Sequence, residues 1–81
     1  MLEPQVLIRK ATSDIEWRLA QIVKAKINLD YDASAYNQEE YNRHIAKLSE
    51  EMNYRQILCE KFREYGEPVE IPSIGKWALG I

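Results

Sequence analysis

The clearest pattern in the chain is a run of apolar positions spaced three and four residues apart. It lies in a stretch without glycine or proline that begins after Asn37 and ends at Gly66. Asn37 with Glu40 matches a capping box, while Gly66 and Pro68 are typical of a helix end. The pattern predicts one long helix over residues 38–65, with a narrow seam formed by Tyr41, Ile45, Leu48, Met52, Cys59 and Phe62.

The second half of this long helix has a wider apolar surface, because Tyr54, Ile57, Leu58 and Tyr65 lie beside the seam. A helix that is apolar round much of its circumference has to be covered on more than one side. Arg55 interrupts the seam. Its side chain either extends outward along apolar neighbours, which Glu51 one turn away favours, or pairs with an acidic partner residue and fixes register.

A second amphipathic pattern predicts a shorter helix over residues 14–29. Ser13 is a candidate N-cap, and the apolar side of the helix holds Ile15, Leu19, Ile22, Val23 and Ile27. Trp17 lies off that stripe, either beneath the N-terminal segment or at an interface. Residues 5–8 form an apolar N-terminal segment that fits a short strand or a first helical turn begun at Pro4.

The sequence changes character after Gly66. Pro68 and Pro72 stop a continuing helix, and the last three apolar residues alternate with other residues. Residues 67–81 are therefore expected to form either a β-hairpin or an extended arm, which docks on the long helix or on another subunit.

We expect a mainly α fold in a single small domain spanning residues 1–81. Its antiparallel helical hairpin covers residues 1–66, and its C-terminal arm covers residues 67–81. Since the first helix is the shorter one, it leaves an end of the long helix uncovered. The alternative is a small α+β fold, in which residues 5–8 and 69–81 make a sheet packed on the long helix.

Composition indicates a folded chain with few covalent means of stabilisation. The 81 residues are 46% hydrophobic and 30% charged, with a formal net charge of −2. The single cysteine, Cys59, excludes an internal disulfide and a multi-cysteine zinc site. Chains of this size often gain stability by association. There is no secretion signal and no apolar run long enough for a membrane span, so a cytoplasmic location, or a particle assembled there, is expected.

The candidate chemical sites are weak, and no catalytic residue, metal or cofactor is predicted. A calcium loop beginning at Asp30 would lack both the glycine and the final glutamate that it requires. Glu40 and His44 share a helix face, but two ligands are too few for a metal site. Cys59 lies on the seam and is expected to act as a small apolar residue.

The leading functional hypothesis is a non-catalytic protein–protein interaction module, a subunit or adaptor of a larger assembly such as a viral or mobile-element one. The apolar end of the long helix and the arm provide most of the predicted contacts. The predicted partner-binding residues are Trp17, Arg55, Leu58, Phe62, Tyr65, Val69, Ile71, Ile74, Trp77, Leu79 and Ile81.

Two alternative functions belong to other classes. One is a small nucleic-acid-binding regulator, which would contact phosphates through the basic residues Arg9, Lys10, Arg18, Lys24 and Lys26. The other is an enzyme with a site at a subunit interface, which would use His44, Tyr41 and a carboxylate.

Overall fold

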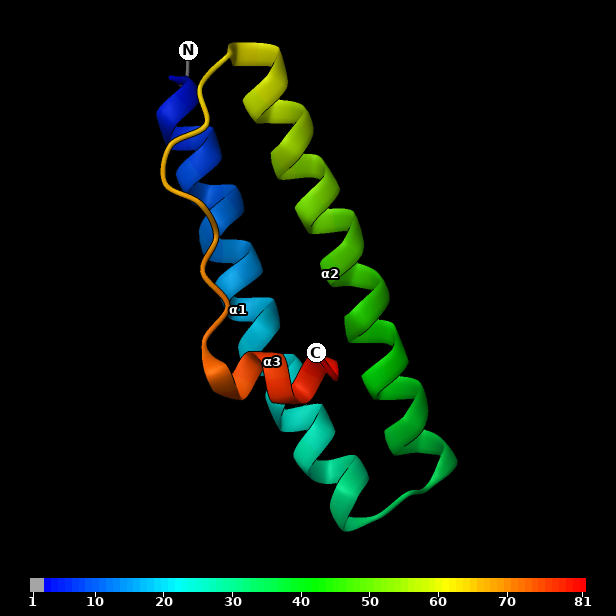
Figure 1. Cartoon of the computed structure of the whole chain (residues 1–81). Helices are drawn as coiled ribbons and strands as arrows, with labels where there is room; N and C mark the ends of the chain where they lie inside the picture. The colour runs from blue at the N-terminus through cyan, green and yellow to red at the C-terminus, as the bar shows by residue number, and fades with distance from the viewer. Residues whose placement is uncertain (1–2) are drawn as a thin grey trace.

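Two long helices and one short helix make up the fold. A computed structural model describes residues 3–81, with α1 at Pro4–Tyr31, α2 at Ala35–Phe62 and α3 at Ser73–Leu79 (Figure 1). α1 and α2 lie side by side and run antiparallel, and the molecule measures 45 × 22 × 17 Å. Because no strand occurs among these residues, the mainly α prediction is confirmed, while the β-hairpin and the α+β alternative are wrong.

The first helix is much longer than predicted, because residues 5–8 belong to it and Ser13 does not cap it. α1 begins with Pro4 in its first turn, where the missing N–H costs nothing. Ile8 and Ala11 lie on the same face as Ile15 and are buried, so continuing the helix upstream of Ser13 extends its packing. α1 and α2 each have 28 residues, and the predicted difference in their lengths is wrong.

The second helix begins slightly earlier than predicted, because Ser34 rather than Asn37 is its N-cap. The Ser34 hydroxyl accepts a hydrogen bond from the Asn37 N–H at 3.2 Å. The Asn37 side chain instead closes the turn before the helix, donating to the Asp32 carbonyl oxygen at 2.7 Å. At the other end α2 stops at Phe62, because Arg63 already adopts a left-handed conformation. Gly66 adopts the left-handed conformation predicted for it, but three residues after the helix has ended.

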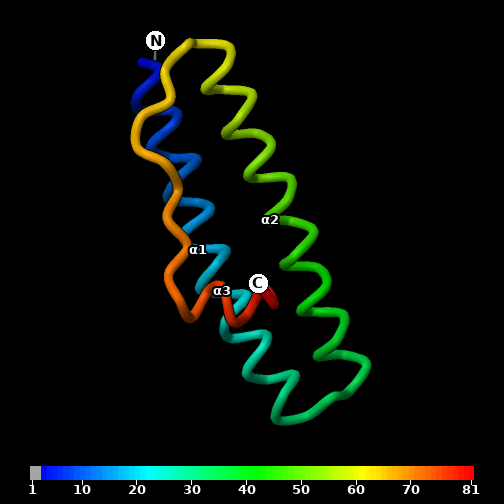
Figure 2. The backbone as a smooth tube through the Cα atoms, viewed as in Figure 1, coloured from blue at the N-terminus to red at the C-terminus, as the bar shows by residue number. Residues whose placement is uncertain are grey.

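The remaining chain returns along the hairpin and ends in α3. Residues 64–72, which we call the strap, are extended and run beside α1 (Figure 2). α3 then crosses the hairpin near its middle. Pro72 precedes α3 and Gly80, with a φ of 79°, ends it. The prediction of an extended arm therefore holds for the strap, whereas residues 73–79 are helical.

The core consists of two clusters along the contact between α1 and α2. One cluster contains Ile8, Ala11, Leu58 and Cys59. The other lies under α3 and contains Ile15, Leu19, Ile22, Leu48 and Ala78, with Val23, Tyr41, Ile45, Val69, Ile71 and Leu79 packed around it. The short helix thus contributes Ala78 and, in part, Leu79 to the core, whereas its Ile74 and Trp77 are exposed.

Candidate interaction surface

Two small residues of α3 face inward, whereas two of its three large apolar residues face outward. Gly75 and Ala78 are buried, whereas Ile74, Trp77 and Ile81 are 55%, 46% and 77% exposed. Ile74 and Trp77 are three residues apart and so share one side of the helix. We call the exposed side chains of Ile74, Trp77 and Ile81 the α3 surface. This arrangement is the reverse of an ordinary amphipathic helix, which buries its largest apolar side chains.

The close seating of α3 explains why its small residues face inward. A Cβ added at Gly75 would lie 3.1 Å from the Ile71 Cγ2 atom, so little room remains there for a side chain. The Tyr41 hydroxyl of α2 donates a hydrogen bond to the Ala78 carbonyl oxygen at 2.6 Å. Gly75 therefore lies against the strap and Ala78 against the hairpin, and the opposite side of α3 faces solvent.

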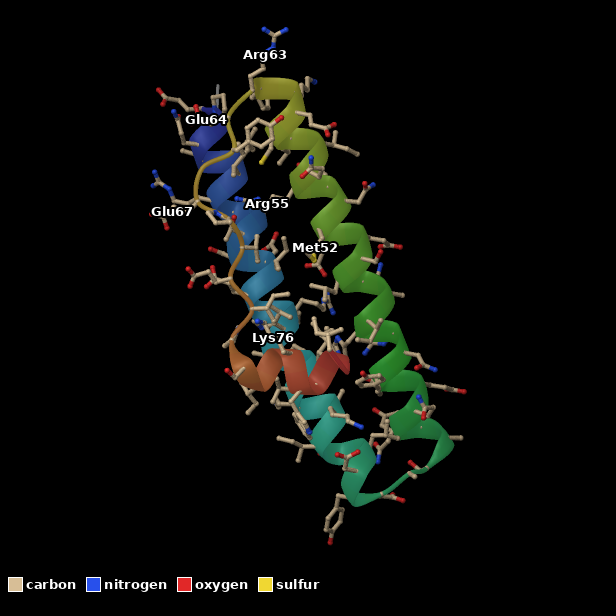
Figure 3. The ribbon with its side chains drawn as sticks, in the orientation of Figure 1. Met52, Arg55, Arg63, Glu64, Glu67 and Lys76 are labelled. Atoms are coloured by element: carbon tan, nitrogen blue, oxygen red, sulfur yellow. The ribbon has the colours of Figure 1, made fainter. Side chains whose placement is uncertain are left out.

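Two further apolar residues, one on each long helix, are also exposed. Ile27 is 50% exposed and lies one turn along α1 from Val23, which packs on the cluster under α3. Met52 is 39% exposed and lies one turn along α2 from the buried Leu48. Met52 projects between the two long helices (Figure 3). Both residues were assigned to apolar stripes from the sequence, and their exposure was not predicted.

The exposure of Ile27 could have been predicted from its position on the helix. Ile27 lies roughly 120° round the helix from Ile15, whereas Ile22 lies only about 20° away. Ile27 is thus at the margin of the apolar stripe. Met52 offered no such signal, because it lies only about 40° round the helix from the buried Leu48.

The other predicted partner-binding residues divide into two groups. Leu58 is buried between the long helices, and Val69, Ile71 and Leu79 pack against the cluster under α3, so these four hold the chain's own fold together. Trp17, Phe62 and Tyr65 are exposed, but they belong to other parts of the chain than α3. The Trp17 ring instead stacks with the Arg18 guanidinium, whose central carbon lies 5.0 Å from the ring centroid.

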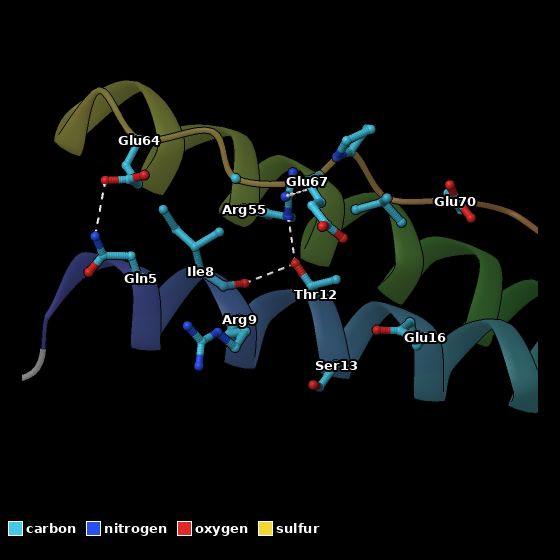
Figure 4. Close-up of a pocket in the computed structure, with 13 residues that line it drawn as sticks. Gln5, Ile8, Arg9, Thr12, Ser13, Glu16, Arg55, Glu64, Glu67 and Glu70 are labelled. Atoms are coloured by element: carbon cyan, nitrogen blue, oxygen red, sulfur yellow. Dashed lines mark hydrogen bonds between the residues drawn. The ribbon is translucent and has the colours of Figure 1, made fainter.

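Arg55 follows neither of the two arrangements expected for it, because its guanidinium binds the strap of its own chain. Its Nε donates to the Thr12 hydroxyl at 2.8 Å, and its Nη2 donates to the carbonyl oxygens of Tyr65 and Glu67 at 3.1 and 2.7 Å. These contacts lie in an open groove of about 820 Å³ between α1 and the strap (Figure 4). The groove is lined by both arginines and glutamates, so it has no single sign of charge.

A polar cluster joins α1 to α2 on part of their contact. Arg18 Nε donates to the Glu51 carboxylate at 2.6 Å, and Arg18 Nη1 donates to His44 Nδ1 at 2.8 Å. Since a guanidinium can only donate, His44 Nδ1 is the acceptor and its ring is neutral. Burial, followed by the charges of Arg18 and Arg43, lowers the pKa of His44, although Glu40 and Glu51 oppose the shift.

The residues considered for catalysis and metal binding take part in contacts within the fold. Tyr41 is hydrogen-bonded to Ala78 and His44 to Arg18, so the two residues of the enzyme hypothesis take part in separate contacts within the fold. Cys59 is fully buried. Between residues 3 and 81, no three His, Cys, Asp or Glu side chains gather closely enough to hold a metal ion.

Three of the five basic residues named on α1 pair with acids of the same chain. Lys10 pairs with Asp14 at 3.3 Å, Arg18 with Glu51 at 2.6 Å and Lys26 with Asp30 at 2.9 Å. A helix that binds phosphates through released counterions needs unneutralised cations along one face. These pairs weaken the basis of the nucleic-acid alternative.

Comparisons of the chain with protein-family models, curated proteins and solved structures gave no match. Within the part of the chain that the structure describes, no helix has an apolar stretch long enough to cross a bilayer.

Proposed function

We propose that this chain is a non-catalytic protein–protein interaction module, a subunit or adaptor, and that it docks through the α3 surface. The single observation that carries the proposal is the orientation of α3, which buries glycine and alanine and exposes isoleucine and tryptophan. The chain's own fold covers neither Trp77 nor Ile81, although both follow a strap that returns them to the hairpin.

The size of the surface supports this role. A free side chain of these types has on the order of 200 Å² of accessible area, so the exposed fractions of Ile74, Trp77 and Ile81 amount to roughly 350 Å². The largest apolar patch on a typical monomer is about 300–600 Å² and is often functional. Tryptophan is also among the residues that contribute most to binding at interfaces.

The test compares native assembly size in the cells from which the chain comes. A tagged wild-type chain is expected to migrate in complexes larger than itself, and the double variant Ile74→Gln, Trp77→Gln is expected to leave them. Glutamine is a good helix former and keeps α3 intact. The control is Tyr54→Gln, Ile57→Gln, which changes two similarly exposed apolar residues on α2.

Two results would refute the proposal. One is a wild-type chain that migrates at its own mass in those cells. The other is an equal loss of complexes in both double variants, since the effect would then not depend on α3. The amide protons of Gly80 and Ile81, which bond to the carbonyls of Trp77 and Lys76, report whether α3 stays folded in each variant.

A further inference from the structure

We infer that the occupant of the α3 surface is a second copy of this chain, packed about a two-fold axis that passes through α3. The inference rests on the proposed function and names its partner. Three observations support it: the chemistry of the surface, its area, and its position on the molecule.

The chemistry of the surface favours a like partner over a charged one. α3 carries one charged side chain, Lys76, beside apolar and small residues. It therefore has no field of one sign that would attract a nucleic acid or a strongly charged protein. In an isologous interface the same patch occurs on both subunits and must complement itself. An apolar patch meets this condition without any further arrangement of charges.

The area fits the centre of a dimer interface. The three residues of the α3 surface expose roughly 350 Å², again taking about 200 Å² for each fully exposed residue. A stable interface buries about 800 Å² on each partner, with an apolar centre and a polar rim. The α3 surface thus provides a little under half of that area as the apolar centre, and the long helices on either side provide the rim.

The position of α3 allows two molecules to meet without obstruction. The molecule is 45 Å long, and α3 lies across the front of the hairpin near its middle, away from both ends (Figure 1). An axis through α3 therefore brings two elongated hairpins together along a broad face. The polar residues of α1 and α2 then lie at the edges of the contact.

The stability of the single chain gives a reason for association. Ten apolar residues within residues 3–81 are buried, and four of these ten are alanine or cysteine. Small domains with modest cores commonly rely on disulfides, metals or oligomerisation. Cys59 is the one cysteine of the sequence, so no disulfide can form within the chain.

The experiment measures the mass of the purified full chain by analytical ultracentrifugation, from micromolar to near-millimolar concentration. The wild-type chain is expected to reach twice its mass of 9.5 kDa at high concentration and to dissociate on dilution. Ile74→Gln, Trp77→Gln is expected to stay at the single-chain mass, whereas Tyr54→Gln, Ile57→Gln is expected to behave as wild type.

A spectroscopic measurement places the contact at α3. The sequence contains two tryptophans, so Trp17→Phe leaves Trp77 as the sole emitter. Its emission is expected to shift to shorter wavelength as concentration rises, because dimerisation removes the indole from water. The same variant with Ile74→Gln is expected to show a weaker shift at each concentration.

The outcomes separate this inference from the proposed function. A wild-type chain that stays monomeric overturns the second copy as partner; the proposed function stands if α3-dependent complexes still form in cells and fails if they do not. A dimer that persists unchanged in Ile74→Gln, Trp77→Gln also overturns the inference, because its interface would lie elsewhere.

Discussion

Arg55 is expected to hold the strap, and replacing it should release the C-terminal segment before the hairpin melts. The residue donates three hydrogen bonds, one to Thr12 on α1 and two to strap carbonyls. At about 1 kcal/mol net for each bond, Arg55→Ala should lower the free energy of unfolding by about 2–3 kcal/mol. In a domain of this size that corresponds to a fall in Tm of roughly 10–20 °C.

The chemistry of the guanidinium predicts the effect of a milder change. Arg55→Lys retains the charge but loses the planar fork that reaches several acceptors together. It should therefore recover only part of the stability lost in Arg55→Ala. Arg43→Ala is the matched control, because Arg43 is also on α2 but pairs with Glu40 on an exposed face. Its Tm should remain close to that of the wild-type chain.

The assay combines thermal denaturation, followed by circular dichroism, with amide hydrogen exchange. In Arg55→Ala, exchange should accelerate most at residues 64–80, while the amides of α1 around Ile15 and Ile22 change less. The reasoning is refuted if Arg55→Ala melts with the wild-type chain. It is also refuted if exchange accelerates equally in α1 and in the strap, since the arginine would then support the hairpin in general.

Two further predictions concern contacts on α2. Because the pKa of His44 lies below its ordinary value of 6.5, the unfolded chain binds this proton at higher pH than the folded chain. Stability should therefore fall as the pH decreases below about 6.5, and thermal melts of His44→Asn, whose amide oxygen can still accept from Arg18, should show a smaller fall. Tyr41→Phe removes the hydrogen bond to Ala78 and should lower the free energy of unfolding in urea by about 1 kcal/mol. Amide exchange should become faster at Gly80 and stay unchanged at Ile15, because the loss is confined to α3. Unchanged exchange at Gly80 would contradict this prediction.

The long second helix could be predicted because its signals are local. A stretch without glycine or proline, apolar positions three and four residues apart, and polar residues before them sufficed to place α2 to within a few residues. Its exact start was missed because Ser34 and Asn37 are both good caps. The choice between them depends on the turn, where Asn37 bonds to the carbonyl of Asp32.

The first and third helices could not be bounded from local signals. Ser13 has the chemistry of an N-cap, but packing of Ile8 and Ala11 against Leu58 and Cys59 continues the helix past it. That packing joins residues far apart in the sequence. Likewise, the alternation of Trp77, Leu79 and Ile81 suggested a strand. In the structure the segment is helical up to Leu79, and the Tyr41 hydroxyl donates a hydrogen bond to the Ala78 carbonyl oxygen of that helix.

The candidate site was predicted in part. Ile74, Trp77 and Ile81 were assigned to partner binding, and the structure leaves all three exposed. Leu58 was assigned to the same role but is buried, since sequence alone does not show that α1 extends far enough to cover it. Arg55 was recognised as unusual, yet its acceptors are backbone carbonyls, which carry no signature in the sequence.

The order in which the chain folds follows from the way its C-terminal segment is attached. α1 and α2 are joined by a short turn and meet as sequence neighbours, whereas the Tyr41–Ala78 contact closes a span of 37 residues. Loop closure of that length has an entropic cost that must be met before any contact is gained. The hairpin should therefore assemble first and α3 should settle on it last, so the tryptophan-bearing segment is also the first to leave during partial unfolding.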